Sequence, residues 1–245
     1  MQKILEDYDT KNPGTIFKDK INISNAEALS IQSEVSKLRE KRGEEVIGYK
    51  IGCISKETQG AKQIIYRVRG DSMPKNHWIN DEEIGGGRLL GEAIHFLDWM
   101  TWVIDKEPTS VFATQSNTNS NSFNITLSYT DGSLGTLVYS MMGSPDVPKE
   151  SIELLMGSTT LVIDNFKKVT VSKEGKRNKN LKLNGKGYKE QLRAFQKSIS
   201  TGSRAHPNAS DGVRATACAI AALKSINKGS LQTLDQSAWT IKEAL

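Results

Sequence analysis

Three side chains that could bind a small polar substrate and move a proton follow a run of three glycines. The run is Gly85–Gly87, and Arg88, Glu92 and His95 come after it at spacings of four and three residues. Residues at these spacings share one face of an α-helix, so a basic, an acidic and an imidazole group are predicted to meet there. Such a set could orient a substrate and transfer a proton. The alternative is that Glu92 and His95 only satisfy each other beneath a sheet.

The elements that must position these residues are a helix and a sheet. The helical pattern continues from the glycines through Ile104, and short strand-like segments with tight turns then run to Val171. Two further helices follow, one over 188–200 and one capped by Ser210–Asp211. We predict an α+β fold with a largely antiparallel, open sheet of about six or more strands and helices packed on one face. A small helix–strand segment is predicted at the N-terminal end.

Composition and charge restrict the classes of protein that this sequence fits. The chain has 245 residues, of which 37% are hydrophobic and 25% charged. It has no apolar run of membrane-spanning length and no secretory-type start, so we expect a cytoplasmic protein without a membrane partner. The two cysteines, Cys53 and Cys218, are too few and too far apart for a disulfide framework or a thiolate metal site.

The positive charge is concentrated in one segment. Residues 167–186 contain eight Lys or Arg and one acid, a balance of +7, which exceeds the net charge of +5 for the whole chain. No aromatic residue lies among these lysines, and Gly and Asn mark hairpin turns. The segment therefore favours a solvated hairpin over a nucleic-acid surface, and no nucleic-acid partner is predicted.

The N-terminal part resembles a known enzyme family. The segments 12–17, 28–32 and 38–52 are similar to the amino-terminal segment of 2-keto-4-pentenoate hydratases, which belong with the fumarylacetoacetate hydrolase-like enzymes. In that family the lysine matching Lys50 belongs to the active site, and a later Glu-x-Glu and an Asp hold a divalent metal. This chain contains no Glu-x-Glu, so Lys50 is interpreted as a remnant and residues 1–62 as a hydratase-like fragment.

The larger part, residues 63–245, resembles a second family from residue 63 to about 239. The residues that show the similarity are Tyr66–Val68, Pro74, His77–Trp78, Gly85–Arg88, Gly91–Glu92, His95–Asp98 and Lys186–Tyr188. They resemble the carboxy-terminal domain of the glucose–fructose oxidoreductase and inositol dehydrogenase family.

The second resemblance implies a substrate site and a catalytic pair. The histidine matching His95 lies in the family's substrate site, often paired with an Asp four residues earlier, where this chain has Gly91. Glu92 is therefore the candidate partner, and His95 and Glu92 are the predicted catalytic residues. Four further residues are implied to line a pocket for a sugar-like substrate: Arg67, Trp78, Arg88 and Tyr188.

The cofactor expected from this resemblance is NAD(P), which the family binds on an amino-terminal Rossmann domain. A dinucleotide-binding loop needs Gly-x-Gly-x-x-Gly after a strand. Counted from Gly85 and Gly87, the third glycine position holds Leu90, and the residues before Gly85 do not read as a buried strand. We therefore predict that this chain alone binds no cofactor and that it joins two truncated parts.

Three functional hypotheses remain open at this stage. The first is a substrate-binding and oligomerisation domain of an NAD(P)-dependent oxidoreductase, incomplete as an enzyme. The second is a non-enzymatic module that self-associates, as a homo-oligomer, through the open face of the sheet. The third is a hydratase-like lyase remnant built around Lys50.

Overall fold

The computed structural model of the chain divides into two compact units, Met1–Ser55 and Lys56–Leu245. The structure describes residues 60–74, 77–80, 84–117, 121–183, 185–203 and 207–239, and in the first unit Glu34, Lys37, Leu38, Lys41 and Arg42. In that first unit Lys37 pairs with Glu34 at 2.8 Å along one helical turn. Lys50 and most of the hydratase-like segment lie outside the described residues.

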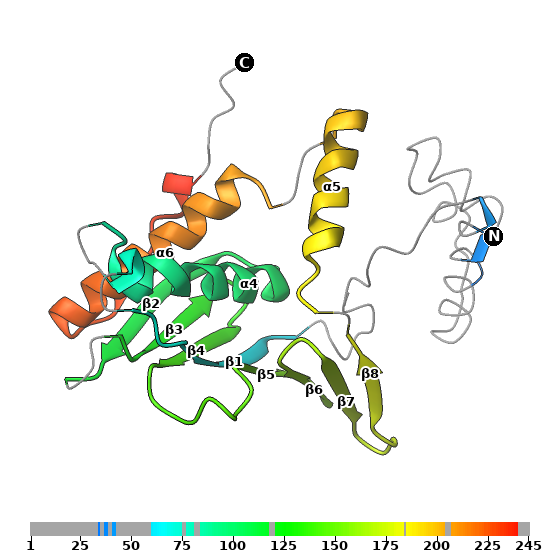
Figure 1. Cartoon of the computed structure of the whole chain (residues 1–245), viewed down its shortest axis with the longest axis horizontal. Coiled ribbons are helices and arrows are strands. Elements are labelled where there is room, and N and C mark those ends of the chain that lie inside the picture. Colours follow the sequence, from blue (N-terminus) through cyan, green and yellow to red (C-terminus); the bar gives the residue numbers. More distant parts are fainter. Residues whose placement is uncertain are drawn as a thin grey trace. The chain divides into compact units, whose positions relative to one another are not determined.

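A nine-stranded sheet forms the centre of the second unit (Figure 1). Its strands are β1 (Lys62–Arg69), β2 (Pro108–Gln115), β3 (Phe123–Tyr129), β4 (Leu134–Ser140), β5 (Glu150–Met156), β6 (Thr159–Asp164), β7 (Lys168–Lys173), β8 (Lys179–Lys182) and β9 (Gln232–Thr233). Their order in the sheet is β8-β7-β6-β5-β1-β4-β3-β2-β9. Only β1 and β4 run parallel; all other neighbours are antiparallel. The predicted α+β class with a largely antiparallel sheet is confirmed.

One face of the sheet is buried because its strands alternate apolar and polar residues. In β1, Ile64 and Val68 are fully buried, whereas Ile65 between them is 37% exposed. The same period of two runs through β3 and β5, as expected for strands with one buried and one open face. A tight turn over Thr130–Ser133 joins β3 to β4, where Asp131 accepts a hydrogen bond from the backbone N–H of Ser133.

Helices cover the buried face of the sheet. They are α4 (Ile94–Ile104) and α6 (Ala209–Lys228), and Figure 1 shows both on one side of the strands. Leu97, Met100 and Ile104 of α4 are fully buried. The third helix, α5 (Tyr188–Thr201), buries only Ser198. Three short helical turns complete the fold: η2 (Trp78–Asn80), η3 (Leu89–Ala93) and η4 (Gln236–Trp239).

The start of α6 differs from the prediction by two residues. Asn208, not Ser210, is the N-cap; its side chain accepts from the N–H of Ser210, and Asp211 accepts from the N–H of Asn208. These reciprocal bonds form a capping box and satisfy N–H groups that the first turn leaves unpaired. None of the described helices is long and apolar enough to cross a membrane.

Candidate functional site

The glycine run forms a tight turn that leads directly into a short π-helix. Gly86 and Gly87 both have φ near +69°, a conformation that residues with a Cβ rarely adopt. A Cβ on Gly85 would lie 2.4 Å from the carbonyl oxygen of Trp78, so η2 packs closely on the turn. The turn therefore positions the start of η3 against the preceding loop.

Arg88 is buried at this junction. Its side chain is 1% exposed, and Nη1 donates to Glu92 Oε2 at 3.0 Å. Nη2 donates to the backbone carbonyl of Asp71 at 2.9 Å. A buried guanidinium needs such partners because an unpaired charge in a poorly solvated site is costly. Arg88 thus joins the helix start to the end of β1.

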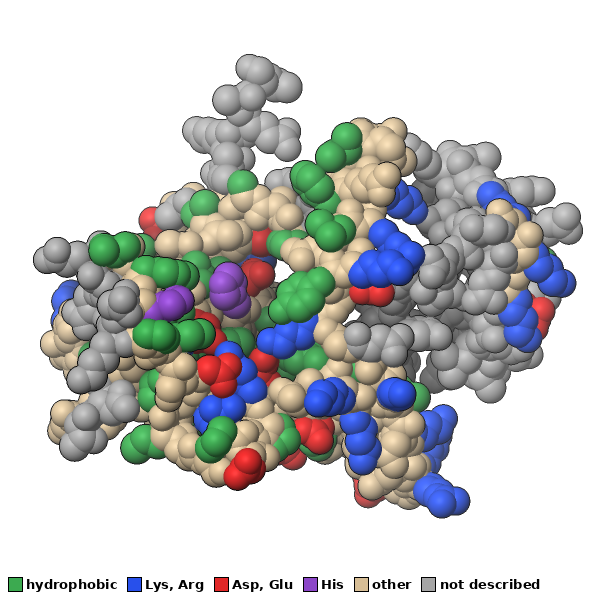
Figure 2. Space-filling view, viewed as in Figure 1, with side chains coloured by type: hydrophobic (Ala, Val, Ile, Leu, Met, Phe, Trp, Pro, Cys, Tyr) green, Lys and Arg blue, Asp and Glu red, His purple; other side chains and the backbone are tan. Residues whose placement is uncertain are grey.

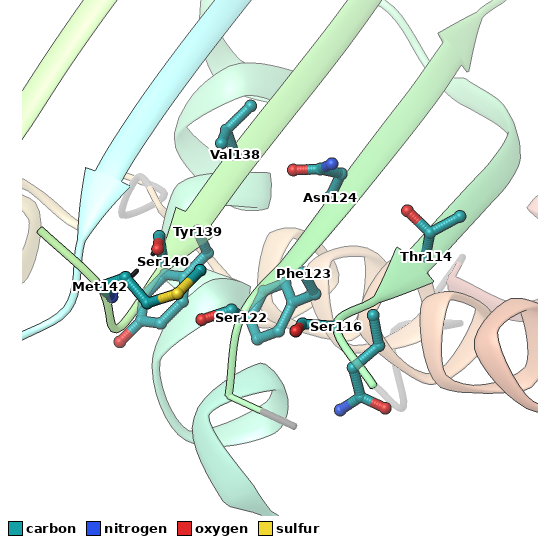
Figure 3. Close-up of a pocket in the computed structure, with 10 residues that line it drawn as sticks. Thr114, Ser116, Ser122, Phe123, Asn124, Val138, Tyr139, Ser140 and Met142 are labelled. Atoms are coloured by element: carbon teal, nitrogen blue, oxygen red, sulfur yellow. Dashed lines mark hydrogen bonds between the residues drawn. The ribbon is translucent and has the colours of Figure 1, made fainter. Parts of the chain in front are cut away.

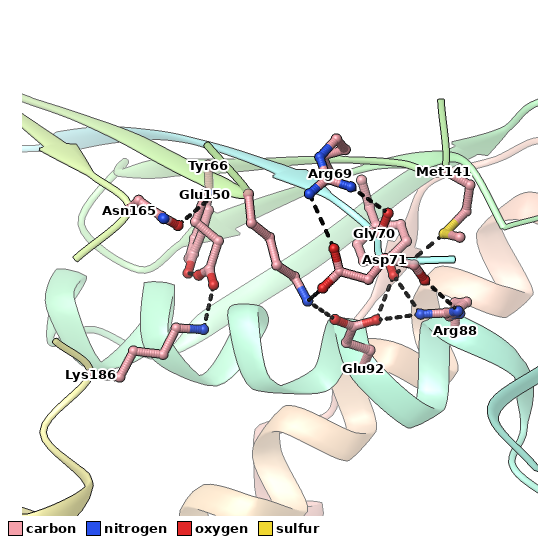
Figure 4. Close-up of polar contacts among 12 residues, drawn as sticks. Tyr66, Arg69, Gly70, Asp71, Arg88, Glu92, Met141, Glu150, Asn165 and Lys186 are labelled. Carbon is pink, nitrogen blue, oxygen red and sulfur yellow. Dashed lines mark hydrogen bonds and ion pairs between the residues drawn. The ribbon is translucent and has the colours of Figure 1, made fainter. Parts of the chain in front are cut away.

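Glu92 is surrounded by donors from three directions. Besides Arg88, Tyr139 donates its hydroxyl to Oε2 at 2.5 Å, and Lys149 donates to Oε1 at 3.0 Å. Lys149 also pairs with Asp71 at 3.1 Å, and Asp71 pairs with Arg69 at 3.1 Å. Figure 4 shows these contacts as one continuous network. We call its six members the Glu92 cluster: Arg69, Asp71, Arg88, Glu92, Tyr139 and Lys149.

The cluster holds Glu92 as a carboxylate. Burial raises the pKa of Glu92, but hydrogen bonds from Tyr139, Lys149 and Arg88 outweigh it, so the pKa lies below its ordinary value. Burial lowers the pKa of Lys149, yet Glu92 and Asp71 raise it above its ordinary value. The pKa of Tyr139 is raised, first by burial and then by its bond to Glu92. The cluster therefore keeps its charges near neutral pH and does not supply a labile proton.

His95 does not join this cluster. It is exposed and, within the part of the chain that the structure describes, it has no hydrogen-bond or ion-pair partner. Trp102, seven residues later, is also exposed, whereas Arg88, seven residues earlier, is buried. In a continuous α-helix all three would share a face.

The π-helix η3 accounts for this difference. It lies between Arg88 and His95, and a π-turn closes i→i+5 hydrogen bonds, which takes up roughly one extra residue. One residue corresponds to about 100° of rotation in an α-helix. The predicted common face is therefore divided: Arg88 and Glu92 turn toward the sheet, and His95 turns to solvent.

A second polar cluster lies farther along the same side of the sheet. Glu150, 1% exposed, accepts hydrogen bonds from the Tyr66 hydroxyl and from Lys186. The pKa of Tyr66 is raised by burial and by Glu150. The ring of Tyr66 meets Phe96 and Trp99 of α4 edge-on at 5.2 and 5.4 Å. Lys149, just before β5, belongs to the Glu92 cluster, and Glu150, the first residue of β5, belongs to the second cluster. We call Tyr66, Glu150 and Lys186 the Glu150 cluster (Figure 4).

The predicted substrate residues do not converge around Arg88. Arg67 alternates with buried Tyr66 and Val68, so it lies on the opposite side of the sheet from α4, where it donates to the carbonyl of Pro148. Trp78 is 52% exposed beside His77, and Tyr188 is 70% exposed at the start of α5. The described residues thus show no shared pocket for these side chains.

A shallow hollow lies where β2 and β4 end and β3 begins, and Tyr139 of the Glu92 cluster is one of the residues that line it. Its volume is about 320 Å³. Figure 3 shows that hydroxyl and amide side chains line it, including Thr114, Ser122 and Asn124, with Phe123 and Met142. None of the predicted site residues lines it.

The glycine turn does not have the geometry of a dinucleotide-binding loop. The glycine turn follows the short helix η2 and not a strand, and its space is filled by Trp78 and Leu90. A phosphate cradle needs open backbone N–H groups at the end of a strand. Across the described ranges, no group of three His, Cys, Asp or Glu could hold a metal.

Sequence reasoning missed four of the six members of the Glu92 cluster: Arg69, Asp71, Tyr139 and Lys149. Tyr139 had a usable signal, since it occupies an inward position in the alternation of β4. Lys149 lies in a polar loop 57 residues from Glu92, and nothing in its local pattern marks the contact.

Comparison with known proteins identifies the domain. The family model described as the C-terminal alpha/beta domain of the oxidoreductase family (GFO_IDH_MocA_C) matches residues 63–234. No curated protein sequence matches the chain. No comparison supports a hydratase-like segment, so that resemblance stays a prediction.

Solved structures share the fold at low identity. An aldose-aldose oxidoreductase from Caulobacter crescentus in complex with glycerol has 14% identity and a TM-score of 0.63, covering 73% of this chain and 57% of that one. A levoglucosan dehydrogenase in complex with NADH and levoglucosan has 15% identity and a TM-score of 0.63, covering 74% and 60%. An NAD binding oxidoreductase from Klebsiella pneumoniae has 14% identity and a TM-score of 0.65, covering 82% and 62%. This chain therefore spans about three fifths of each of these proteins.

Proposed function

The chain belongs to the oxidoreductase family defined by this C-terminal alpha/beta domain, and we propose that it acts as the substrate-binding and oligomerisation domain of an NAD(P)-dependent enzyme for a sugar- or cyclitol-like substrate. The observation that supports this proposal most strongly is the family match over residues 63–234. Solved proteins with the same fold carry names that refer to sugars and NADH, including the aldose-aldose oxidoreductase and levoglucosan dehydrogenase.

Within this proposal His95 and Glu92 have different tasks. His95 is exposed and can reach a substrate bound over α4, so it is the group that exchanges a proton. Glu92 is held by three donors and orients the start of the helix that presents His95. Trp78 and Tyr188 are exposed and available for contact with a sugar ring, whereas Arg88 is buried in the Glu92 cluster and Arg67 lies on the opposite side of the sheet.

The domain is proposed to be incomplete for hydride transfer. The glycine turn does not fit a dinucleotide, so NAD(P) would not be held at this turn. Titration of the purified chain with NADH, followed by nicotinamide fluorescence, should show no saturable change. Saturable binding at micromolar NADH would contradict this part of the proposal.

Substrate binding is tested by saturation-transfer NMR with levoglucosan, glucose and myo-inositol. We expect transfer to at least one of them, and loss of that transfer in His95→Ala. Lys228→Ala, at the far end of α6, is the control and should bind as the wild type does. Equal saturation transfer to the ligand in the wild type and in His95→Ala would show that His95 does not contribute to substrate binding.

Two alternatives rest on narrower observations. The open face of the sheet, which exposes Ile65, Phe112 and Val162, favours a non-enzymatic module that self-associates there.

The N-terminal resemblance favours a chimeric chain with a hydratase-like remnant around Lys50, for which Mg²⁺-dependent hydration of a 2-keto-4-enoate is the assay. Absence of that activity would leave the remnant without a catalytic role.

A further inference from the structure

Helix α5 exposes four large apolar side chains on one side. Tyr188, Leu192, Phe195 and Ile199 are 70%, 70%, 57% and 68% exposed. Figure 2 shows hydrophobic side chains along the left side of α5 and basic ones along its right side. We call these four residues the α5 stripe. Single exposed apolar residues are common, but a continuous row of this size marks an interaction surface.

The spacing of the residues in the stripe indicates that its partner is another helix. Its residues are four, three and four apart, which is the spacing of d and a positions in a heptad repeat. A narrow row of this kind fits the facing row of another helix, with each side chain inserted between residues of the partner. A lipid surface or a flat protein surface would instead suit a broader apolar face.

The charges around the stripe permit two copies of the same helix to meet. The positions beside the stripe are Gln191, Gln196, Ser198 and a single cation, Lys189. Arg193 and Lys197 lie on the opposite side of the helix, away from any partner on the stripe. Two identical helices can therefore approach without bringing rows of like charge together.

The basic hairpin of β7 and β8 sets the direction of pairing. It ends just before α5, at Lys182 and Lys186. Parallel pairing would place the two hairpins side by side, whereas antiparallel pairing separates them by roughly 20 Å, the length of a 14-residue helix. Antiparallel pairing also places Lys189 beside Gln196 of the other copy, because both flank the stripe on the same side.

We propose that α5 pairs with α5 of a second copy of this chain, antiparallel and about a two-fold axis between Leu192 and Phe195. Leu192 of one copy faces Phe195 of the other, and Tyr188 faces Ile199, so the contact is self-complementary. Burying the stripe of both copies removes roughly 1,000 Å² from water, near the lower limit for a specific interface. This contact is separate from the open sheet face. It covers Tyr188, so a chain paired in this way offers Trp78 and not Tyr188 to the proposed sugar-like substrate.

Sedimentation velocity of the full chain over a range of concentrations tests the proposal. We expect the mean mass to rise with concentration from 27.0 kDa to twice that value. Leu192→Glu and Phe195→Glu should each keep the chain at the monomer mass, since both put a charge in the contact. Lys197→Glu, on the opposite side of α5, and Val162→Glu, on the open sheet face, are controls and should still dimerise. Circular dichroism confirms that each variant is folded.

Cysteine cross-linking tests the direction of the helices. A chain carrying Lys189→Cys and Gln196→Cys should form intermolecular disulfides between positions 189 and 196, identified by mass spectrometry after digestion. A wild-type chain that stays at the monomer mass overturns the proposal. So does a dimer that persists in Leu192→Glu and is lost in Val162→Glu, since the sheet face would then be the interface.

Discussion

The Glu92 cluster and the α5 stripe lie in the same compact unit, but the cluster consists of charged and polar side chains that pair with one another, and the stripe consists of exposed apolar side chains. The cluster holds its charges in contact with one another, and its members come from the end of β1, from η3, from β4 and from the loop before β5. The stripe leaves apolar side chains exposed, and no element of the described part of the chain covers them. A closed set of ion pairs has a structural task within the chain, whereas exposed apolar residues acquire one only when a partner covers them. The Glu92 cluster therefore stabilises the domain itself, whereas the α5 stripe is a surface for a partner.

Removal of the Arg88 guanidinium should have the largest effect on stability. Arg88→Met keeps an apolar stem of similar length, but it removes one of the three donors to Glu92 and the guanidinium donor to the carbonyl of Asp71. Breaking a buried pair on one side costs about 3–5 kcal/mol of unfolding free energy. Urea denaturation followed by circular dichroism measures this loss.

The matched control is Arg69→Met in the same cluster. Arg69 pairs with Asp71, whose side chain is 46% exposed, so its loss should cost no more than about 1 kcal/mol. Equal losses in the two variants would mean that the cluster is not organised around Arg88.

The Glu150 cluster should give an intermediate effect. Glu150→Gln keeps the shape of the side chain but removes the charge that accepts from Tyr66 and Lys186. Hydrogen bonds to a charged group contribute about 1.5–3 kcal/mol, and we expect a loss of about 2 kcal/mol. The same urea measurement applies, and a loss below about 0.5 kcal/mol would indicate that water replaces these bonds.

The free energy of unfolding should depend on pH because the pKa of Glu92 differs between the folded and unfolded chain. The pKa of Glu92 is lower in the folded chain than its ordinary value of 4.5, so its contribution is present above pH 4.5 and is lost as the pH falls through the folded pKa. Lys149 behaves in the opposite sense: its pKa is raised above 10.5, so its contribution is lost only as the pH rises through the higher folded value.

Unfolding free energies measured between pH 7 and pH 3 test this expectation. The wild type should lose stability toward pH 3, and Glu92→Gln should lose less over the same interval because position 92 no longer takes up a proton. Parallel curves for the two proteins would show that Glu92 has the same pKa in both states.

Substitution in the stripe should have the smallest effect on the monomer. Leu192→Ala, measured at concentrations where only monomer sediments, should change stability by no more than about 0.5 kcal/mol because Leu192 is already exposed. Leu97→Ala in α4 is the comparison, since Leu97 is fully buried and its truncation should cost about 2–5 kcal/mol. A large loss in Leu192→Ala would show that the stripe is covered within the chain.

Much of the fold could be predicted because the signals are local. The alternation in β3 and β5 marks strands with one buried face, and Gly132 marks the turn between β3 and β4. The basic segment was predicted to be a hairpin, and β7 and β8 form it. The two-residue error at the start of α6 arose because Asn208 and Ser210 are both good capping residues, and only the backbone selects between them.

The candidate site was less predictable because it depends on helix register and on distant contacts. The spacing of Arg88, Glu92 and His95 indicates one face only if the helix is a regular α-helix, and the π-turn of η3 divides that face.

The sequence by itself determined the order of the elements, the buried side of each strand and the apolar row of α5, since each follows from residues a few positions apart. Only the tertiary structure decided which charges meet. Tyr139 and Lys149 reach Glu92 from 47 and 57 residues away, and their contacts exist because β4 and the start of β5 flank β1 beside η3. Side-chain pairing across a fold depends on the packing of whole elements, and for that reason Glu92 became part of a closed cluster while His95 stayed open to solvent.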